Sequence, residues 1–309
     1  MIKFNNFLEA TLYFNTEKKC REYLENIRWE GKPYCPHCDH SEKIYKFKDE
    51  KTYKCSACKK KFTVTVGSVF ENSNVSLQKW LLSLYLVSST KKGISSIQLG
   101  KAIGVTQKTA WFMLQRIREM LKEEAESMLE GVVEIDETYV GGKAKNKHAK
   151  ARRELRKNGT GYMNMTPVVG MLQRGGKIRM IALKHVHKIN GSVLKPLVYD
   201  NVAKDSVLIT DGHGGYYGLK NTYKQHEVVR HDQGEYVRGM YHTNTIEGAW
   251  SHLKRTILGT YHYVSVKHLD RYCNESSFRY NNRKKHECLR FDTALENCKG
   301  RLKYKELIK

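Results

Sequence analysis

Four cysteines are arranged in two pairs that could bind a single metal ion. Cys35 and Cys38 form one Cys-x-x-Cys pair, and Cys55 and Cys58 form the other, with sixteen residues between the pairs. Two residues between thiolates allow a tight turn to direct both sulfurs at one ion, and tetrahedral Zn²⁺ takes four such ligands at about 2.3 Å. A redox-active Cys-x-x-Cys is the alternative. Two matched pairs predict one structural zinc ion in a zinc ribbon, and because four thiolates close the coordination sphere, we expect no catalysis there.

Two aspartates occupy apolar segments that are typical of buried strands. Asp136 lies in the middle of residues 132–140, and Asp211 ends residues 206–211. A carboxylate in a buried strand is costly unless it is paired or bound to a metal. One such aspartate could simply be hydrogen-bonded. Two in one sheet favour a site for chemistry.

A third group of polar side chains lies on the predicted helix that follows Thr243. Helical spacing places one polar face opposite an apolar face. The polar face could simply be solvated. However, thirty-five residues separate Asp211 from Glu247, and six separate Glu247 from Lys254, which favours a functional face. The polar face holds Asn244, Glu247, Ser251 and Lys254, and the apolar face holds Ile246, Trp250, Leu253 and Ile257.

The charge of the chain favours a polyanionic partner. Its 309 residues include 55 Lys and Arg against 32 Asp and Glu, a net charge of +23. A folded protein this basic most often contacts nucleic acid, although a basic protein without such a partner is possible. No apolar run reaches the ~18 residues of a membrane span, and the N-terminus does not resemble a signal peptide. We therefore expect a cytoplasmic, nucleoid-associated protein of prokaryotic type, with no membrane contact. The basic segment 143–157 is expected to be a loop that either faces DNA or is merely solvated.

Residues 94–117 predict a helix-turn-helix. Ser95 or Ser96 can cap a first helix, Gly104 can make the turn, and Thr106 can cap a second helix. In such motifs the start of the second helix contacts base edges in the major groove. A helical hairpin that only packs against its neighbours is the alternative. The side chains expected to bind DNA are Gln107, Lys108, Thr109 and Trp111.

The remaining pattern predicts an α/β fold with several domains. Strands are expected at 132–140, 165–173, 177–186, 206–211 and 226–231, with helices at 192–202, 243–258 and 265–282. Three strands followed by an alternating section indicate a mixed sheet with flanking helices. The expected parts are a helical segment (1–30), a zinc ribbon (31–70), a helix-turn-helix region (71–130), the α/β domain (131–285) and a basic tail (286–309).

Taken together, these motifs resemble insertion-sequence transposases of the DDE type with an N-terminal zinc ribbon. The resemblance rests on CPHC…CSAC, the 95–118 helix pair, EIDETYVGGK, ITDGHGGY and HTNTIEGAWSHLKR. It implies an RNase H-like fold for the α/β domain, with Asp136 and Asp211 as the first two catalytic acids. Some members use Asn at the third position, so the resemblance leaves Glu247 and Asn244 open. We favour Glu247.

This resemblance implies a two-metal phosphoryl transfer on DNA. Two Mg²⁺ or Mn²⁺ ions about 4 Å apart can stabilise the attacking and leaving oxygens. Asp136 would bridge both ions, and Asp211 and Glu247 would each bind one. Lys254 and Arg255 would contact phosphates. The partners would be double-stranded DNA, both element termini and target, bound by a homodimer. The alternatives are a non-catalytic DNA-binding regulator and a nuclease that cuts without joining.

Overall fold

The protein is described by a computed structural model that covers residues 3–308, except 124–126, 143–147, 150–152, 154–164, 185 and 187–188. The chain divides into two compact units. Unit 1 comprises Met1–Glu123 together with Lys284–Lys309, and unit 2 comprises Glu124–Arg283. Most of the basic segment 143–157 lies outside the described residues. Within those residues, no helix is both long and apolar enough to cross a membrane.

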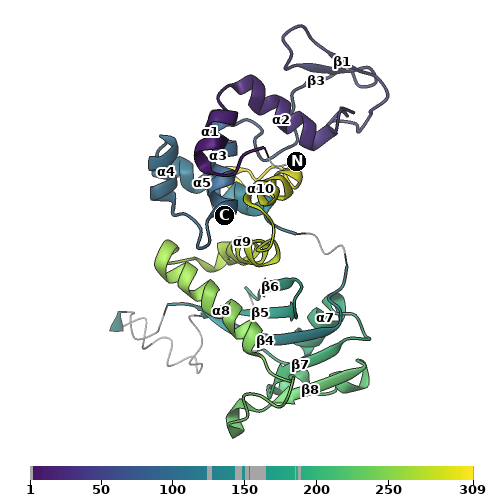
Figure 1. Ribbon diagram of the computed structural model, residues 1–309, viewed down its shortest axis with the longest axis vertical. Helices are drawn as coiled ribbons and strands as arrows, with labels where there is room; N and C mark the ends of the chain where they lie inside the picture. The colour runs from purple at the N-terminus through teal and green to yellow at the C-terminus, as the bar shows by residue number, and fades with distance from the viewer. Residues whose placement is uncertain are drawn as a thin grey trace. The chain divides into compact units, whose positions relative to one another are not determined.

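Within the described residues, unit 2 is built on a five-stranded mixed sheet in the order β6-β5-β4-β7-β8 (Figure 1). β5 pairs antiparallel with β4 and β6, whereas β7 runs parallel to both β4 and β8. The expected strands are all present, with ends that differ by a few residues. Their bounds are β4 Val132–Gly141, β5 Met165–Gln173, β6 Ile178–Ala182, β7 Val207–Asp211 and β8 Gln225–Val229.

Helices cover both faces of this sheet. α8 (Asn244–Thr256) and α9 (Leu269–Asn281) pack on one face, where Ile246, Trp250 and Leu269 meet Val168 and its neighbours. α7 (Gly191–Asn201) packs on the other face against alternate residues of β4 and β5. α8 continues into a π-helical turn at Ile257–Tyr261. The two layers flanking one mixed sheet confirm the expected α/β, RNase H-like fold class.

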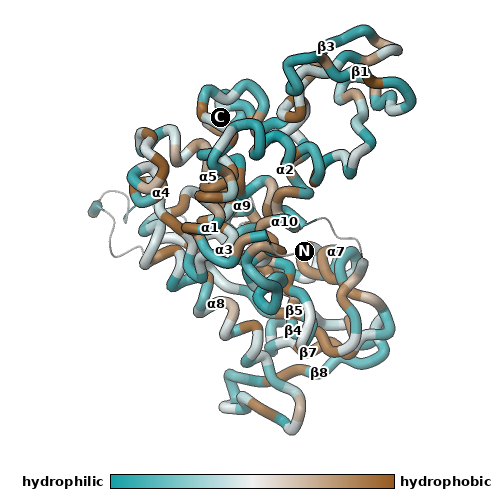
Figure 2. The backbone as a smooth tube through the Cα atoms, turned by 45° about the horizontal axis from the view of Figure 1, so that its top comes forward, coloured by the Kyte–Doolittle hydropathy of each residue, from teal (hydrophilic) through white to brown (hydrophobic). Residues whose placement is uncertain are grey.

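The N-terminal part of unit 1 is a small antiparallel sheet that follows two helices. The helices are α1 (Phe7–Tyr13) and α2 (Glu17–Trp29), and the sheet has the order β1-β2-β3. Figure 2 shows that this sheet is mostly hydrophilic. Its aromatic core is limited to Trp29, Tyr53 and Phe62, with Trp29 and Tyr53 ring centroids 5.0 Å apart. The strands are β1 Ile44–Lys46, β2 Tyr53–Cys55 and β3 Lys61–Phe62.

The rest of unit 1 is helical and has a separate aromatic core. Phe4 packs with Phe14, Tyr85 and Phe291 at ring-centroid distances between 5.5 and 5.6 Å. Residues 286–309, expected from their charge to form a tail, therefore supply core residues, because Phe291 of α10 is fully buried. The helices are α3 Leu77–Ser89, α4 Ser96–Ile103, α5 Gln107–Met120, α10 Glu287–Glu296 and α11 Tyr304–Ile308.

The helix pair α4–α5 has the geometry expected from its sequence. Ser95 caps α4 in a capping box with Gln98, Gly104 ends it in the left-handed conformation at φ 65°, and Thr106 caps α5. Gly100 allows the close approach of the two helices, since a Cβ there would lie 2.9 Å from a backbone oxygen of the turn. The structure thus shows two capped helices joined by a tight turn, and a DNA-binding helix-turn-helix remains a prediction.

Candidate active site and zinc site

The four paired cysteines form one cluster with the dimensions of a zinc site. Their sulfur atoms all lie within 4.8 Å of one another. Cys35 Sγ lies 3.6 Å from Cys58 Sγ, and Cys38 Sγ lies 3.7 Å from Cys55 Sγ. Four ligands at 2.3 Å around a tetrahedral ion would be about 3.8 Å apart. The residues present therefore fit a structural zinc ion.

Two similar turns build this cluster. The backbone N–H of Cys35 donates to His40 and that of Cys55 donates to Lys60, at 2.8 and 3.1 Å. Directly after each pair, Asp39 and Lys59 adopt left-handed φ values of 56° and 60°. Burial opposes ionisation of the Cys55 thiol, but N–H groups of the turn outweigh it and lower its pKa to about 6. Burial instead raises the pKa of Cys35 to about 12. The turns thus direct four sulfur atoms at a common centre.

The two aspartates meet where the parallel pairing of β4 and β7 ends. The β4–β7 pairing ends at Ile135 opposite Thr210, so Asp136 and Asp211 are the next residues on neighbouring strands. Their carboxylate oxygens and one from Glu137 all lie within 4.8 Å of one another. Glu137 was missed in the sequence because strand alternation places it on the opposite face from Asp136. Since β7 ends at Asp211, the side chains of Asp136 and Glu137 can both reach the carboxylate of Asp211 past the end of that strand.

The side chain of Asp136 is oriented by a tryptophan of α8. Trp250 Nε1 donates to Asp136 Oδ2 at 2.9 Å. The indole lies over Gly170 of β5, where a Cβ would be 2.4 Å from the ring. Burial and the nearby charges of Asp211 and Glu247 raise the pKa of Asp136 to about 6. The carboxylates are therefore near enough to repel one another, an arrangement that a divalent cation would relieve.

Glu137 is held from the opposite face of the sheet. The hydroxyl of Tyr216, a buried residue just after β7, donates to Glu137 Oε1. Burial, together with the charges of Asp211 and Asp136, raises the pKa of Glu137 to about 8. Three acids with such close oxygens match the hard ligands that Mg²⁺ or Mn²⁺ takes.

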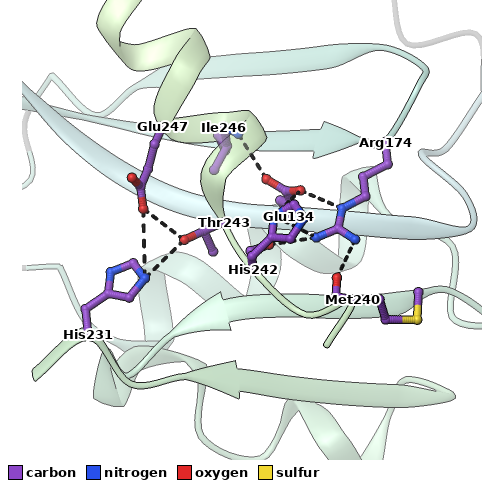
Figure 3. A network of polar contacts seen from close by, with 8 residues as sticks. All are labelled: Glu134, Arg174, His231, Met240, His242, Thr243, Ile246 and Glu247. Atoms are coloured by element: carbon purple, nitrogen blue, oxygen red, sulfur yellow. Dashed lines mark hydrogen bonds and ion pairs between the residues drawn. The ribbon is translucent and has the colours of Figure 1, made fainter. Parts of the chain in front are cut away.

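The two candidates for the third position lie on the first turn of α8. Glu247 has a half-exposed side chain and accepts a hydrogen bond from Thr243 Oγ1 at 3.1 Å. His231 Nε2 lies 3.9 Å from Glu247 Oε1 (Figure 3). Asn244 is exposed at the first residue of the helix. Neither belongs to the cluster of three acids, but the charge of Glu247 acts on Asp136.

The predicted DNA contacts occupy exposed or half-buried positions. Lys254 and Arg255 are exposed on the last turn of α8. At the start of α5, Lys108 is exposed and lies 5.9 Å from the Tyr304 ring centroid, and Gln107 donates to Ser96 Oγ at 2.8 Å. The two remaining predicted contacts, Thr109 and Trp111, are partly buried.

A mixed sheet in this order, with acids in the middle of β4 and at the end of β7 and a helix bearing further polar groups, defines the RNase H-like class of the DDE transposase domain. Comparison with known proteins agrees. Residues 128–281 match an ISXO2-like transposase domain, and residues 15–61 match a transposase zinc-ribbon domain.

A curated relative extends the match over most of the chain. An uncharacterized protein in transposable element ISH50 of Halobacterium salinarum is 32% identical over 276 residues, which cover 86% of this chain and 91% of the relative. The chain therefore belongs to the insertion-sequence transposases that carry a zinc-ribbon domain.

The raised pKa of Glu137 predicts a measurable pH dependence of stability. The unfolded chain loses this proton near 4.5, whereas the folded protein keeps it to about 8. This group's contribution to the free energy of unfolding is thus full below pH 4.5 and is lost as the pH rises to 8. At pH 8, Glu137→Gln should raise the free energy of unfolding of unit 2 by about 2 kcal/mol.

Denaturant unfolding at pH 5 and pH 8 tests this, with zinc retained and other divalent ions left out. Glu227→Gln is the matched control, because Glu227 of β8 is paired with Arg238 and does not belong to the cluster of three acids. An unchanged pH dependence in Glu137→Gln would contradict the prediction.

Proposed function

We propose that this transposase cuts the ends of its element and joins the freed 3′-hydroxyl to target DNA by metal-assisted phosphoryl transfer. The observation that carries the proposal is the meeting of Asp136, Glu137 and Asp211 oxygens within 4.8 Å, just past the end of the parallel β4–β7 pairing. In open α/β sheets, ligands commonly bind in a crevice beyond the carboxyl ends of parallel strands, and β7 ends at Asp211. The net charge of +23 supplies attraction for the DNA backbone.

Each protein group has a proposed role in this reaction. Asp136 and Asp211 would bind two Mg²⁺ or Mn²⁺ ions, which supply charge stabilisation for the attacking and leaving oxygens. Trp250 keeps Asp136 in one orientation, and Tyr216 does the same for Glu137. Lys254 would bind phosphates near the scissile bond, together with Arg255. No covalent protein–DNA intermediate is needed.

A non-catalytic regulator and a nuclease that does not join remain the competing functions. A labelled duplex with the element's terminal repeat, incubated with Mg²⁺ and without added divalent ions, tests the first of them. Metal-dependent cutting at the element end supports the enzyme. Specific binding without cutting, with Mg²⁺ or Mn²⁺, would overturn it in favour of a regulator.

Glu247 is proposed as the third ligand in preference to Asn244. Its charge reaches Asp136, and Thr243 holds it in place. Glu247→Ala should therefore lower the cleavage rate by about 100-fold or more, whereas Asn244→Ala should lower it by about tenfold or less. Single-turnover cleavage rates of the two variants decide between them, and the reverse order of effects would assign the ligand role to Asn244.

The α4–α5 pair is proposed to recognise the element ends. Gln107 lies at the exposed start of α5, where a side chain can reach base edges, and Lys108 can reach phosphates. Lys108→Ala should weaken binding of all DNA sequences by a few-fold and reduce the slope of log affinity against log salt by about 1. Gln107→Ala should instead reduce the preference for the terminal repeat. Fluorescence anisotropy at several salt concentrations measures both, and an unchanged salt slope in Lys108→Ala would contradict the assignment.

We propose further that a homodimer binds the DNA, because two element ends must be cut in concert. The mass of the complex with end DNA in solution tests this. One protomer per pair of ends would contradict it.

A further inference from the structure

A buried glutamate lies on β4 two residues before Asp136. Glu134 has no exposed surface and points to the same face of the sheet as Asp136. Its Oε1 accepts a hydrogen bond from Arg174 Nε at 2.6 Å, and its Oε2 accepts one from the backbone N–H of Ile246 at 3.0 Å. A charge in such a position is tolerated only when it is fully paired. His242 Nδ1 also lies 3.7 Å from Oε1. Both oxygens of Glu134 are therefore used, and one of its partners is the start of α8.

The start of α8 has no cap of its own. Thr243 occupies the position before the helix but makes no side-chain cap hydrogen bond. Its hydroxyl donates to Glu247 instead. The first backbone N–H groups of a helix need acceptors and favour a negative charge. Glu134 supplies both from the neighbouring strand, so a β4 side chain replaces the local cap and leaves Thr243 free to contact Glu247.

Arg174 ties the same glutamate to the segment that enters α8. It lies in the turn after β5, and its two terminal nitrogens donate to the carbonyls of Met240 and His242 at 2.6 and 2.8 Å. Figure 3 shows the guanidinium between Glu134 and this segment. Its donors therefore fix the chain immediately before α8, while Glu134 fixes the helix itself.

We infer that Glu134 and Arg174 are positioning residues for Glu247. β4 carries both Asp136, a proposed metal ligand, and Glu134, which caps α8. Because α8 carries Glu247, the buried ion pair of Glu134 and Arg174 sets the spacing between Asp136 and Glu247. The inference rests on the proposed function. It goes beyond that function because it assigns a role to residues that bind no metal: both oxygens of Glu134 are already engaged by Arg174 and Ile246.

Mn²⁺ binding to the full-length protein, followed by electron paramagnetic resonance, tests this without relying on activity. Groups that orient metal ligands typically change metal affinity by 10–100-fold when removed. Glu134→Ala should weaken Mn²⁺ binding by about tenfold. Glu134→Gln, which keeps an acceptor for the Ile246 N–H, should weaken it less. The matched control is Glu275→Ala, because Glu275 forms another buried ion pair, with Arg279 within α9.

A double-variant comparison separates positioning from general destabilisation. If Glu134 acts through Glu247, Glu134→Ala combined with Glu247→Ala should bind Mn²⁺ no more weakly than Glu247→Ala alone. Losses that multiply, equal losses in Glu134→Ala and Glu275→Ala, or wild-type binding by Glu134→Ala would each overturn the inference.

The test also distinguishes failure of the inference from failure of the proposed function. Unchanged Mn²⁺ binding in Asp136→Asn would reject the metal site, and the inference with it. A loss in Asp136→Asn with none in Glu134→Ala would reject the positioning role alone.

Discussion

Asp136→Asn is expected to reduce metal-dependent cleavage of element-end DNA by at least ~1000-fold. Asp136 is the proposed shared ligand of two ions, and an amide lacks the charge that binds them. The substitution should not destabilise the protein. Burial and the charges of Asp211 and Glu247 raise the pKa of Asp136 to about 6, so the neutral amide relieves repulsion at neutral pH. Single-turnover cleavage and thermal unfolding measure the two effects.

Asp205→Asn is the matched control for this substitution, because Asp205 is exposed in the turn before β7 and lies outside the acid cluster. It should cleave at the wild-type rate. Cleavage by Asp136→Asn within tenfold of the wild-type rate would show that the cluster of three acids is not the catalytic centre.

Replacing one zinc ligand is expected to unfold the ribbon and to abolish specific binding of element ends. The small sheet is hydrophilic and has few buried aromatic residues (Figure 2). Structural zinc contributes roughly 10 kcal/mol or more to the folding of such segments. Cys55→Ser should therefore release the zinc and expose residues 31–62 to proteolysis, with a loss of at least tenfold in affinity for end DNA.

The zinc content of the purified variants, together with limited proteolysis, checks this prediction. Cys20→Ala is the control, because Cys20 is a buried thiol of α2 outside the cluster and should leave one zinc per chain. If Cys55→Ser kept its zinc and its protease resistance, the four-cysteine site would be wrong.

The sequence predicts the zinc ribbon and the fold of unit 2 because each depends on short-range patterns. The paired cysteines specify their turns directly, and alternating β-branched residues specify strands such as Val132–Gly141. The capping residues Ser95 and Thr106 likewise mark the ends of α4 and α5. Each of these signals is a short stretch of neighbouring residues.

The composition of the acid cluster could not be predicted in the same way. Glu137 reaches Asp211 only because β7 ends at Asp211, one residue after the last residue of β7 that pairs with β4. The register of β4 against β7 depends on two segments far apart in the sequence, so the sequence pattern of either strand does not reveal it. Glu134 and Arg174 are forty residues apart and look like ordinary surface charges in the sequence. The packing of α10 in unit 1 could not be predicted for the same reason. The basic charge of residues 286–309 predicted a tail, whereas Phe291 is buried in a core with Phe4, which lies far away in the sequence.

The most direct test of the account is joining of a pre-cut element end to a target plasmid. The substrate is a duplex that already has the terminal 3′-hydroxyl, supplied with Mg²⁺ to wild type, Asp136→Asn and Asp211→Asn. We predict joined products with the wild type that need the divalent ion and are absent with both variants. Joining by either variant at the wild-type level, or none by a wild-type protein that binds the ends, would contradict the claim that these acids catalyse transposition.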